Sequence, residues 1–219
     1  MRDQVIATGM VLEATPVNDY DRRIVILTKE FGKITAFCNG ARRQRSRLLA
    51  VTNPFVFGSF KLYEGKNAYN LADADISYYF EELRSDFEGA YLGMYFLEYA
   101  SYYTRENNDE IMMLKLLFQS VRAITKPAVD NRLIRAVYEI KTVQVNGEYP
   151  GLPVDRSFLP ATQKAVDHIV NSPIEHLYTF AVSDEVLNEL LYLGDLYRKR
   201  VVDKPFKSLE TLENCMLKL

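Results

Sequence analysis

The feature that most constrains the fold is a change in hydrophobic period near Ser77. Before it, five short stretches of β-branched and aromatic residues are separated by turn residues, at positions 4–17, 23–28, 34–38, 54–63 and 69–76. After it, apolar residues recur with helical spacing, most clearly in a stripe of tyrosines: Tyr91, Tyr95, Tyr99 and Tyr103. The pattern predicts a small β domain followed by an all-α domain.

The β stretches favour a closed barrel. Gly9 and Gly58 interrupt two of them, and glycines inside strands indicate the bulges and sharp bends that a closed barrel requires. Five strands within about 75 residues fit the OB-fold, a five-stranded Greek-key barrel. We therefore predict an α+β multidomain chain, with an OB-fold at residues 1–78 and a helical domain at residues 79–219.

Capping and breaking residues divide the second domain into helices. Beyond the tyrosine stripe, helices are predicted at 111–121, 130–146, 162–170, 173–180, 183–203 and 208–217. Prolines make residues 148–160 an irregular connection. A four-residue period over three turns is typical of a core-facing helix, so the tyrosines are interpreted as packing residues in preference to base-stacking ones.

The composition is that of a globular cytoplasmic protein. The chain is 48% hydrophobic and 26% charged, and no apolar run approaches the ~20 residues that span a membrane. The first residues lack the apolar core of a signal peptide. With Cys38 and Cys215 alone, a disulfide framework is not expected, which favours a reducing compartment.

A basic segment follows the third predicted strand. Arg42, Arg43, Arg45 and Arg47 occur within six residues, and guanidinium forks match phosphate oxygens. Their mutual repulsion predicts an extended, mobile segment until an anion neutralises it. The net charge of −2 argues against nucleic-acid binding, but residues 1–75 carry 11 basic and 8 acidic residues. The segment alone fits a phosphate-binding loop and an ordinary solvated loop equally well.

An OB-fold binds single strands by guiding phosphates along a positive groove and stacking bases on aromatic rings. Phe31, Tyr63 and Tyr69 are candidate rings in the first domain. The candidate DNA-binding cations of the barrel are Arg22, Arg23, Lys33, Arg42, Arg43, Arg45, Arg47, Lys61 and Lys66.

Signs of catalysis are weak. No phosphate loop, dinucleotide-binding glycine pattern or His-Glu-x-x-His motif occurs. The two histidines, His168 and His176, fall on separate segments, and Cys38 shares a strand face with apolar residues. Asp73 and Asp75 would lie on one strand face, where they could bind magnesium or simply end a solvated strand. We therefore expect no enzymatic activity, no metal and no cofactor.

Several motifs resemble the RecO family of bacterial recombination mediators. Residues 19–22 (DYDR), 24–33 (IVILTKEFGK) and 39–43 (NGARR) follow one another in that family's order. Residues 46–48 (SRL), 53–55 (NPF) and 204–209 (KPFKSL) continue the resemblance into both domains.

The resemblance implies binding of single- and double-stranded DNA, annealing of complementary strands and help in loading recombinase on gaps coated with single-strand-binding protein. It implies two protein partners: RecR, and the C-terminal tail of single-strand-binding protein, contacted through the helical domain. Many relatives hold zinc on cysteines after the third helix, but residues 148–172 contain no cysteine. This chain should therefore bind no structural zinc.

Two other hypotheses remain open from the residues. One is a protein-interaction scaffold whose basic barrel docks an acidic protein partner; it would bind that partner but no oligonucleotide at low salt. The other is a hydrolase that uses Asp73 and Asp75 with magnesium, and it predicts metal-dependent turnover that Asp→Asn changes abolish.

Overall fold

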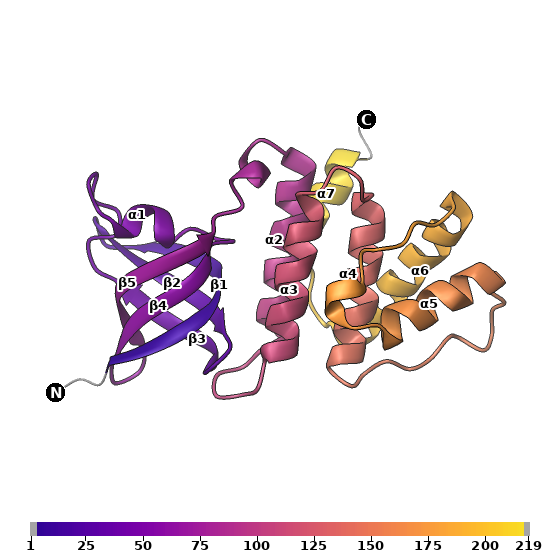
Figure 1. Cartoon of the computed structure of the whole chain (residues 1–219), viewed down its shortest axis with the longest axis horizontal. Helices are drawn as coiled ribbons and strands as arrows, with labels where there is room; N and C mark the ends of the chain where they lie inside the picture. The colour runs from indigo at the N-terminus through magenta and orange to yellow at the C-terminus, as the bar shows by residue number, and fades with distance from the viewer. Residues whose placement is uncertain (1–3, 217–219) are drawn as a thin grey trace. The chain divides into compact units, whose positions relative to one another are not determined.

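A computed structural model describes residues 4–216 (Figure 1). The chain divides into two compact units. The barrel unit comprises residues up to Ser85 together with Leu97–Leu114. The helical unit comprises Asp86–Phe96 and the residues from Lys115 onward. Helices α2 (Phe87–Tyr103) and α3 (Ile111–Ile124) thus contribute residues to both units.

The predicted five-stranded barrel is confirmed. Its strands are β1 (Gln4–Val17), β2 (Asp21–Thr28), β3 (Gly32–Cys38), β4 (Phe57–Glu64) and β5 (Tyr69–Tyr78). They close in the order β1-β2-β3-β5-β4. All neighbours pair antiparallel except β3 and β5, which are parallel over two residue pairs. This is an OB-fold barrel.

Alternation along each strand builds the barrel core. On β2 and β3, Ile24, Ile26, Ile34 and Ala36 are buried in the barrel cluster, while the residues between them face outward. Of the bulge or sharp bend expected at Gly9, the bulge does not form there, because the β1–β2 register shifts between Val11 and Glu13; at Gly58 the β4–β5 register does shift, between Phe57 and Gly58. Gly9 instead permits close approach, since a Cβ there would lie 2.1 Å from the Leu27 carbonyl oxygen.

The β2–β3 hairpin is fixed to the connection between α2 and α3, within the barrel unit. The Lys33 amide donates to the Arg105 carbonyl at 2.9 Å, and the Asn107 amide donates to the Phe31 carbonyl at 3.0 Å. Gly32 adopts φ +65° between these contacts. The turn residues that close the hairpin therefore also bind the α2–α3 connection, far along the chain.

The remaining helices are α4 (Asn131–Val145), α5 (Pro160–Asn171), α6 (Asp184–Val201) and α7 (Lys207–Met216). Asp130 and Ser183 cap α4 and α6 through their side chains, as their sequence positions predict. The helix expected at 173–180 is wrong: only a 3-10 turn forms, at Ile174–His176. The predicted end of α7 at Leu217 lies outside the described residues.

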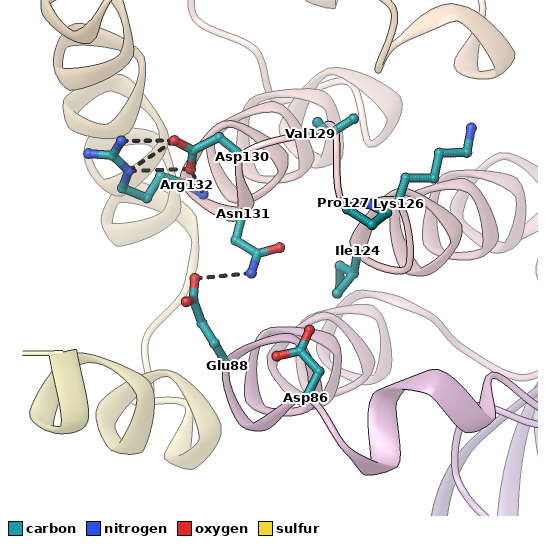
Figure 2. Close-up of a pocket in the computed structure, with 9 residues that line it drawn as sticks. All are labelled: Asp86, Glu88, Ile124, Lys126, Pro127, Val129, Asp130, Asn131 and Arg132. Carbon is teal, nitrogen blue, oxygen red and sulfur yellow. Dashed lines mark hydrogen bonds and ion pairs between the residues drawn. The ribbon is translucent and has the colours of Figure 1, made fainter.

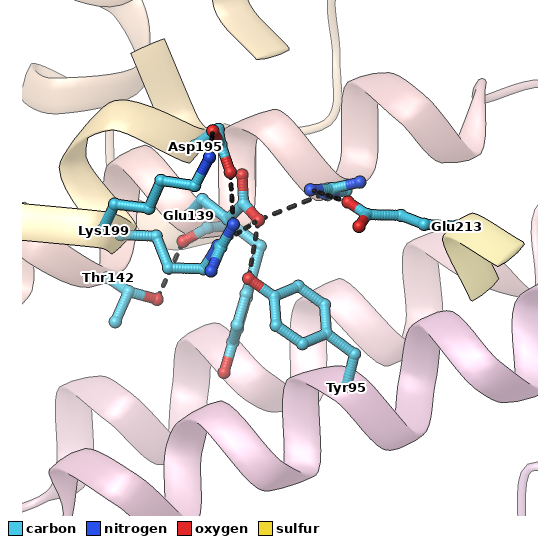
Figure 3. Close-up of polar contacts among 9 residues, drawn as sticks. Tyr95, Glu139, Thr142, Asp195, Lys199 and Glu213 are labelled. Carbon is cyan, nitrogen blue, oxygen red and sulfur yellow. Dashed lines mark hydrogen bonds and ion pairs between the residues drawn. The ribbon is translucent and has the colours of Figure 1, made fainter. Parts of the chain in front are cut away.

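A buried polar network joins α2, α4, α6 and α7 in the helical unit (Figure 3). Glu139 is fully buried and accepts a 2.6 Å hydrogen bond from the Tyr95 hydroxyl. Arg135 lies 3.1 Å from the same carboxylate and 3.0 Å from Glu213, and Arg198 lies 3.6 Å from Glu139. Burial disfavours the charge of Arg135, but the Glu139 carboxylate raises the pKa of this guanidinium. Tyr95 therefore serves packing and the buried network.

None of the helices within residues 4–216 combines the length and the hydropathy needed to cross a membrane.

Candidate nucleic-acid interface

The basic segment between β3 and the short helix α1 (Leu48–Val51) is a series of tight turns. The Arg43 amide donates to the Gly40 carbonyl at 3.1 Å, and the Ser46 amide donates to the Arg43 carbonyl at 2.9 Å. The prediction of an extended segment is therefore wrong. Backbone hydrogen bonds fold this segment locally, while the side chains of Arg43 and Arg45 stay exposed.

The β1–β2 turn anchors the beginning of this loop. The Gly40 amide donates to the Asp21 carboxylate at 2.7 Å, and the Arg42 amide donates to the Tyr20 carbonyl at 2.8 Å. The Arg42 guanidinium also reaches the carbonyls of Asn18 and Asp19, at 3.2 and 3.3 Å. The loop therefore has a defined position on one end of the barrel.

Arg22 anchors the other side of the loop. Its guanidinium donates to the Thr52 hydroxyl and to the Asn53 side-chain oxygen, each at 2.9 Å. Burial lowers the pKa of Arg22, although arginine stays charged at neutral pH. Across the strand pair, burial raises the pKa of Cys38 to about 12, in accord with its interpretation as a core residue. One amino group of Arg22, Nη1, is thus turned toward the protein.

Arg43 and Arg45 differ from Arg42 and Arg47 because their side chains form no hydrogen bond or ion pair within residues 4–216. Both are exposed, and within residues 4–216 neither forms an ion pair. The Arg43 guanidinium lies 5.4 Å from the centre of the Tyr20 ring. A cation–π contact orients a guanidinium while leaving its charge to attract an anion.

Arg47 and Lys61 lie beside a carboxylate. Arg47 is 3.6 Å from Asp73 on β5 and donates to the Ala72 carbonyl at 3.4 Å. Lys61 on β4 is paired with Asp73 across the sheet. Asp73 and Asp75 do share one strand face, but the described chain contains no group of three or more side chains arranged to hold a metal ion.

The other predicted cations lie elsewhere on the barrel. Arg23 on β2 forms an ion pair with Glu13 at 3.0 Å. Lys33 lies at the hairpin end of β3, opposite the basic loop, and its ammonium donates to the Ser101 carbonyl at 2.5 Å. Lys66 is exposed in the turn between β4 and β5. The structure thus gathers Arg42, Arg43 and Arg45 on one loop and separates Lys33 from it.

The aromatic residues are placed differently from the prediction. Phe31 and Tyr69 pack on each other at 5.9 Å and against the barrel core, whereas Tyr63 is 37% exposed. Sequence reasoning missed Phe37 and Tyr20, which are 38% and 55% exposed. The sequence does contain the information that exposes Phe37: strand alternation places it on the face opposite Ala36 and Cys38, and that other face is apolar.

The helical unit contains a polar cavity of about 350 Å³ where α2 and α4 begin and α3 ends (Figure 2). Several of its polar side chains are hydrogen-bonded within the lining or to the backbone. Arg132 pairs with Asp130 at 2.8 Å, and Asn131 donates to Glu88 at 3.0 Å. The Asp86 carboxylate accepts from the Gly89 amide at the start of α2. This cavity therefore lies where helix caps meet, and Lys126 also lines it.

A second cavity, also of about 350 Å³, is mainly apolar. It lies between residues 150–155 and the C-terminal half of α6, where Leu196, Tyr197 and Arg200 line it. The Tyr197 hydroxyl donates to the Gly151 carbonyl at 3.0 Å and thereby holds the proline-rich connection in place. This connection is ordered by packing, and it creates an apolar hollow with one cation at its edge.

Comparisons with known proteins extend over both parts of the chain. A family model described as "Recombination protein O N terminal" matches residues 1–80. The DNA repair protein RecO of Acetivibrio thermocellus is 26% identical over 94% of this chain and 95% of its own length. That of Clostridium acetobutylicum is 24% identical over 93% and 95%, and that of Alkaliphilus metalliredigens is 31% identical over 66% and 58%. The two longer alignments include the barrel and the helices.

Proposed function

The chain belongs to the RecO family of DNA repair proteins, and from this premise we propose that it is a non-enzymatic recombination mediator. It binds single- and double-stranded DNA, anneals complementary strands and helps to load recombinase on gaps coated with single-strand-binding protein. The OB barrel of residues 1–78 is the nucleic-acid-binding domain, and residues 79–219 form the helical domain. The observation that carries this proposal is the anchored loop that presents Arg43 and Arg45 without carboxylate partners.

The proposed mechanism of annealing is electrostatic. Two complementary strands repel each other through their phosphates, and the loop guanidinium groups neutralise part of that charge where the strands meet. Anchoring by Arg22 and Asp21 supports this role, because a fixed loop loses less conformational entropy when it binds. Neutralising three phosphates of a single strand predicts a slope of log K against log salt of about −2, and neutralising four predicts about −3.

The test is fluorescence anisotropy of a labelled single-stranded oligonucleotide, titrated with wild type and with the Arg43→Ala/Arg45→Ala variant. We expect the variant to lose most of its affinity at low salt, and its salt slope to flatten by about 1.4, since two phosphate contacts are removed. Its urea unfolding midpoint should match wild type because both side chains are exposed. A matched control, Lys126→Ala/Lys164→Ala, removes two exposed cations from the helical unit. Equal losses in both variants would refute a specific role for the loop.

Annealing is measured separately, by the rate at which two complementary labelled oligonucleotides form a duplex. The loop variant should anneal slowly even at concentrations that saturate the strands, because bridging two strands needs more neutralised phosphates than holding one. Normal annealing by a variant with weak binding would contradict the electrostatic mechanism.

The alternative function is a scaffold whose basic barrel docks an acidic protein partner. The same unpaired arginines favour it, since they attract carboxylates as well as phosphates. Binding of an acidic protein at low salt, together with no detectable binding of any oligonucleotide, would support the scaffold.

For the tail of single-strand-binding protein we propose the apolar cavity beside α6. An acidic tail with an apolar end suits it, because Leu196 and Val154 are exposed and Arg200 supplies a positive charge. Binding of a synthetic tail peptide should be lost in Leu196→Asp. It should be retained in Met94→Asp, which changes an equally exposed side chain on α2. Loss in both variants would point to a general charge effect.

We further propose that the protein acts with RecR and associates with the nucleoid in the cytoplasm. Family membership supports both statements. Co-sedimentation of the purified protein with RecR, with and without gapped DNA, tests the first and shows in which order the components assemble.

A further inference from the structure

The outer surface of β2 and β3 is covered at one end and open at the other. Leu27 faces away from the barrel core, yet it is fully buried, and its cross-strand partner Lys33 reaches the Ser101 carbonyl of α2. Nearer the basic loop, the outward residues Arg23 and Phe37 have no such cover. The open end therefore adjoins the segment that carries the unpaired arginines.

Phe37 lies on this open surface. It is 38% exposed, although Ala36 and Cys38 on either side of it are fully buried in the core. It is paired with Arg23 on β2 and with Asn70 on β5. Single exposed apolar residues are common on protein surfaces and carry no meaning by themselves. The position of this ring and the charges around it are what make it informative.

The position follows from the strand register. Arg22 is paired with Cys38, and Arg23 with Phe37, so the ring lies one residue pair from the end of the sheet. The basic loop leaves β3 at that end. At about 3.3 Å per residue, the Phe37 backbone is roughly 10 Å of chain from Gly40, where the turns of the loop begin.

The charges favour a base over a phosphate at the ring. The Arg23 guanidinium is paired with Glu13 at 3.0 Å, and Glu13 also accepts from the Thr15 hydroxyl at 2.7 Å. The Arg23–Glu13 ion pair has almost no net charge, and the Glu13 carboxylate repels phosphate. The unpaired charge lies on the adjacent loop, at Arg43 and Arg45. The surface thus separates an uncharged aromatic area from a cationic one.

We propose that Phe37 is a base-stacking platform for single-stranded nucleic acid, with the phosphates of the same strand held by the basic loop. This inference rests on the proposed DNA binding. It adds that the barrel contacts the bases of the strand as well as its phosphates. Stacking on an aromatic ring is independent of base identity because every base has a π-face. A paired duplex does not offer base faces to the ring, so Phe37 distinguishes single from double strands.

The absence of tryptophan from the sequence provides a direct test. Phe37→Trp introduces a single indole, whose fluorescence is excited apart from that of tyrosine. Titration with unlabelled oligothymidine should quench this fluorescence. The dissociation constant fitted to the quenching curve should equal the one found by anisotropy. Met112→Trp, at a side chain 50% exposed in the same unit, is the matched control and should show no quenching. Equal signals from the two variants would overturn the proposal.

Affinity provides a second measurement. Phe37→Ala should bind oligothymidine roughly tenfold more weakly than wild type, and Phe37→Tyr should bind as wild type does. Duplex affinity should change less than twofold in either variant. If wild type binds single strands while Phe37→Trp is not quenched and Phe37→Ala binds normally, the platform is refuted and the proposed function stands. If wild type binds no oligonucleotide at low salt, both fail.

Discussion

Gly32 and Gly40 offer a comparison that isolates one tertiary contact of the barrel. Both glycines adopt a left-handed conformation, with φ of +65° and +66°. A Cβ at position 32 would lie 2.3 Å from the Arg105 carbonyl oxygen, whereas a Cβ at position 40 would find only the Arg43 side chain, at 3.5 Å. Alanine at both positions therefore carries the same backbone strain, but only one of them meets a rigid neighbour.

The expected magnitudes follow from these distances. Left-handed backbone costs a non-glycine residue about 1–2 kcal/mol, and this is the whole effect expected for Gly40→Ala. In Gly32→Ala the hairpin must withdraw by about 1 Å to restore ordinary contact. That movement weakens the Lys33–Arg105 and Asn107–Phe31 backbone hydrogen bonds, now 2.9 and 3.0 Å long. Each is worth about 0.5–1.5 kcal/mol, so Gly32→Ala should cost about 2 kcal/mol more than Gly40→Ala.

Urea unfolding followed by circular dichroism measures the difference, and thermal unfolding should show an extra fall of about 4–8 °C for Gly32→Ala. DNA binding, measured below the unfolding transition, checks that the effect of Gly32→Ala is local, because Gly32 lies at the opposite end of β3 from the basic loop. Gly32→Ala should bind normally. Equal destabilisation by the two substitutions would refute the reasoning, since it would mean that the contact with residue 105 contributes nothing to stability.

Three further predictions concern titratable groups. At pH 8 a thiol reagent should label Cys215, which is partly exposed, but not Cys38, whose pKa burial raises to about 12; labelling of both thiols in the native protein would contradict this. A hydrogen bond from Arg132 holds the pKa of Asp130 below its ordinary value. The Asp130 carboxylate therefore stabilises the folded protein at any pH above the ordinary aspartate pKa, and this stabilisation is lost as the pH falls through the lowered pKa of the folded state. Urea unfolding of wild type and Asp130→Asn should therefore differ by less than about 1 kcal/mol at neutral pH, because the pair is exposed, and converge in acid; a constant difference would exclude the linkage. Glu139→Gln should lower the unfolding free energy, but by less than the roughly 3–5 kcal/mol of a fully broken buried pair, because Arg135 keeps Glu213 and Arg198 keeps Asp195; an unchanged midpoint would show that the network is not charged.

Much of the fold could be predicted because its signals are local. Strands alternate every second residue, and the five strands appeared at nearly the predicted positions. Asp130 and Ser183 begin helices because their side chains satisfy amides two or three residues away. Two short elements were not predicted correctly. The helix expected at 173–180 is a single 3-10 turn, and α1 was not predicted because four residues are too few to show a helical period.

The basic loop shows the limit of this reasoning. Four arginines in six residues were visible, but their partners were not. Arg42 reaches carbonyls about 23 residues earlier in the chain, and Arg47 reaches Asp73 on another strand. Sequence proximity contains no information about acceptors at such separations. A prediction based on charge repulsion alone therefore gave an extended segment where the backbone folds into turns.

The sequence by itself determined the barrel, the helical part, the presence of a basic loop and the resemblance to RecO, because periodicity, capping and short motifs depend on neighbouring residues. Only the tertiary structure decided which cations keep an unengaged charge and which rings face solvent. The sequence offers Arg22 and Lys33 as candidate cations on the same footing as Arg43 and Arg45, yet the side chains of the first two donate to protein oxygens and those of the last two do not within the described chain. The physical reason is that the availability of a charge depends on the groups that the fold brings against it.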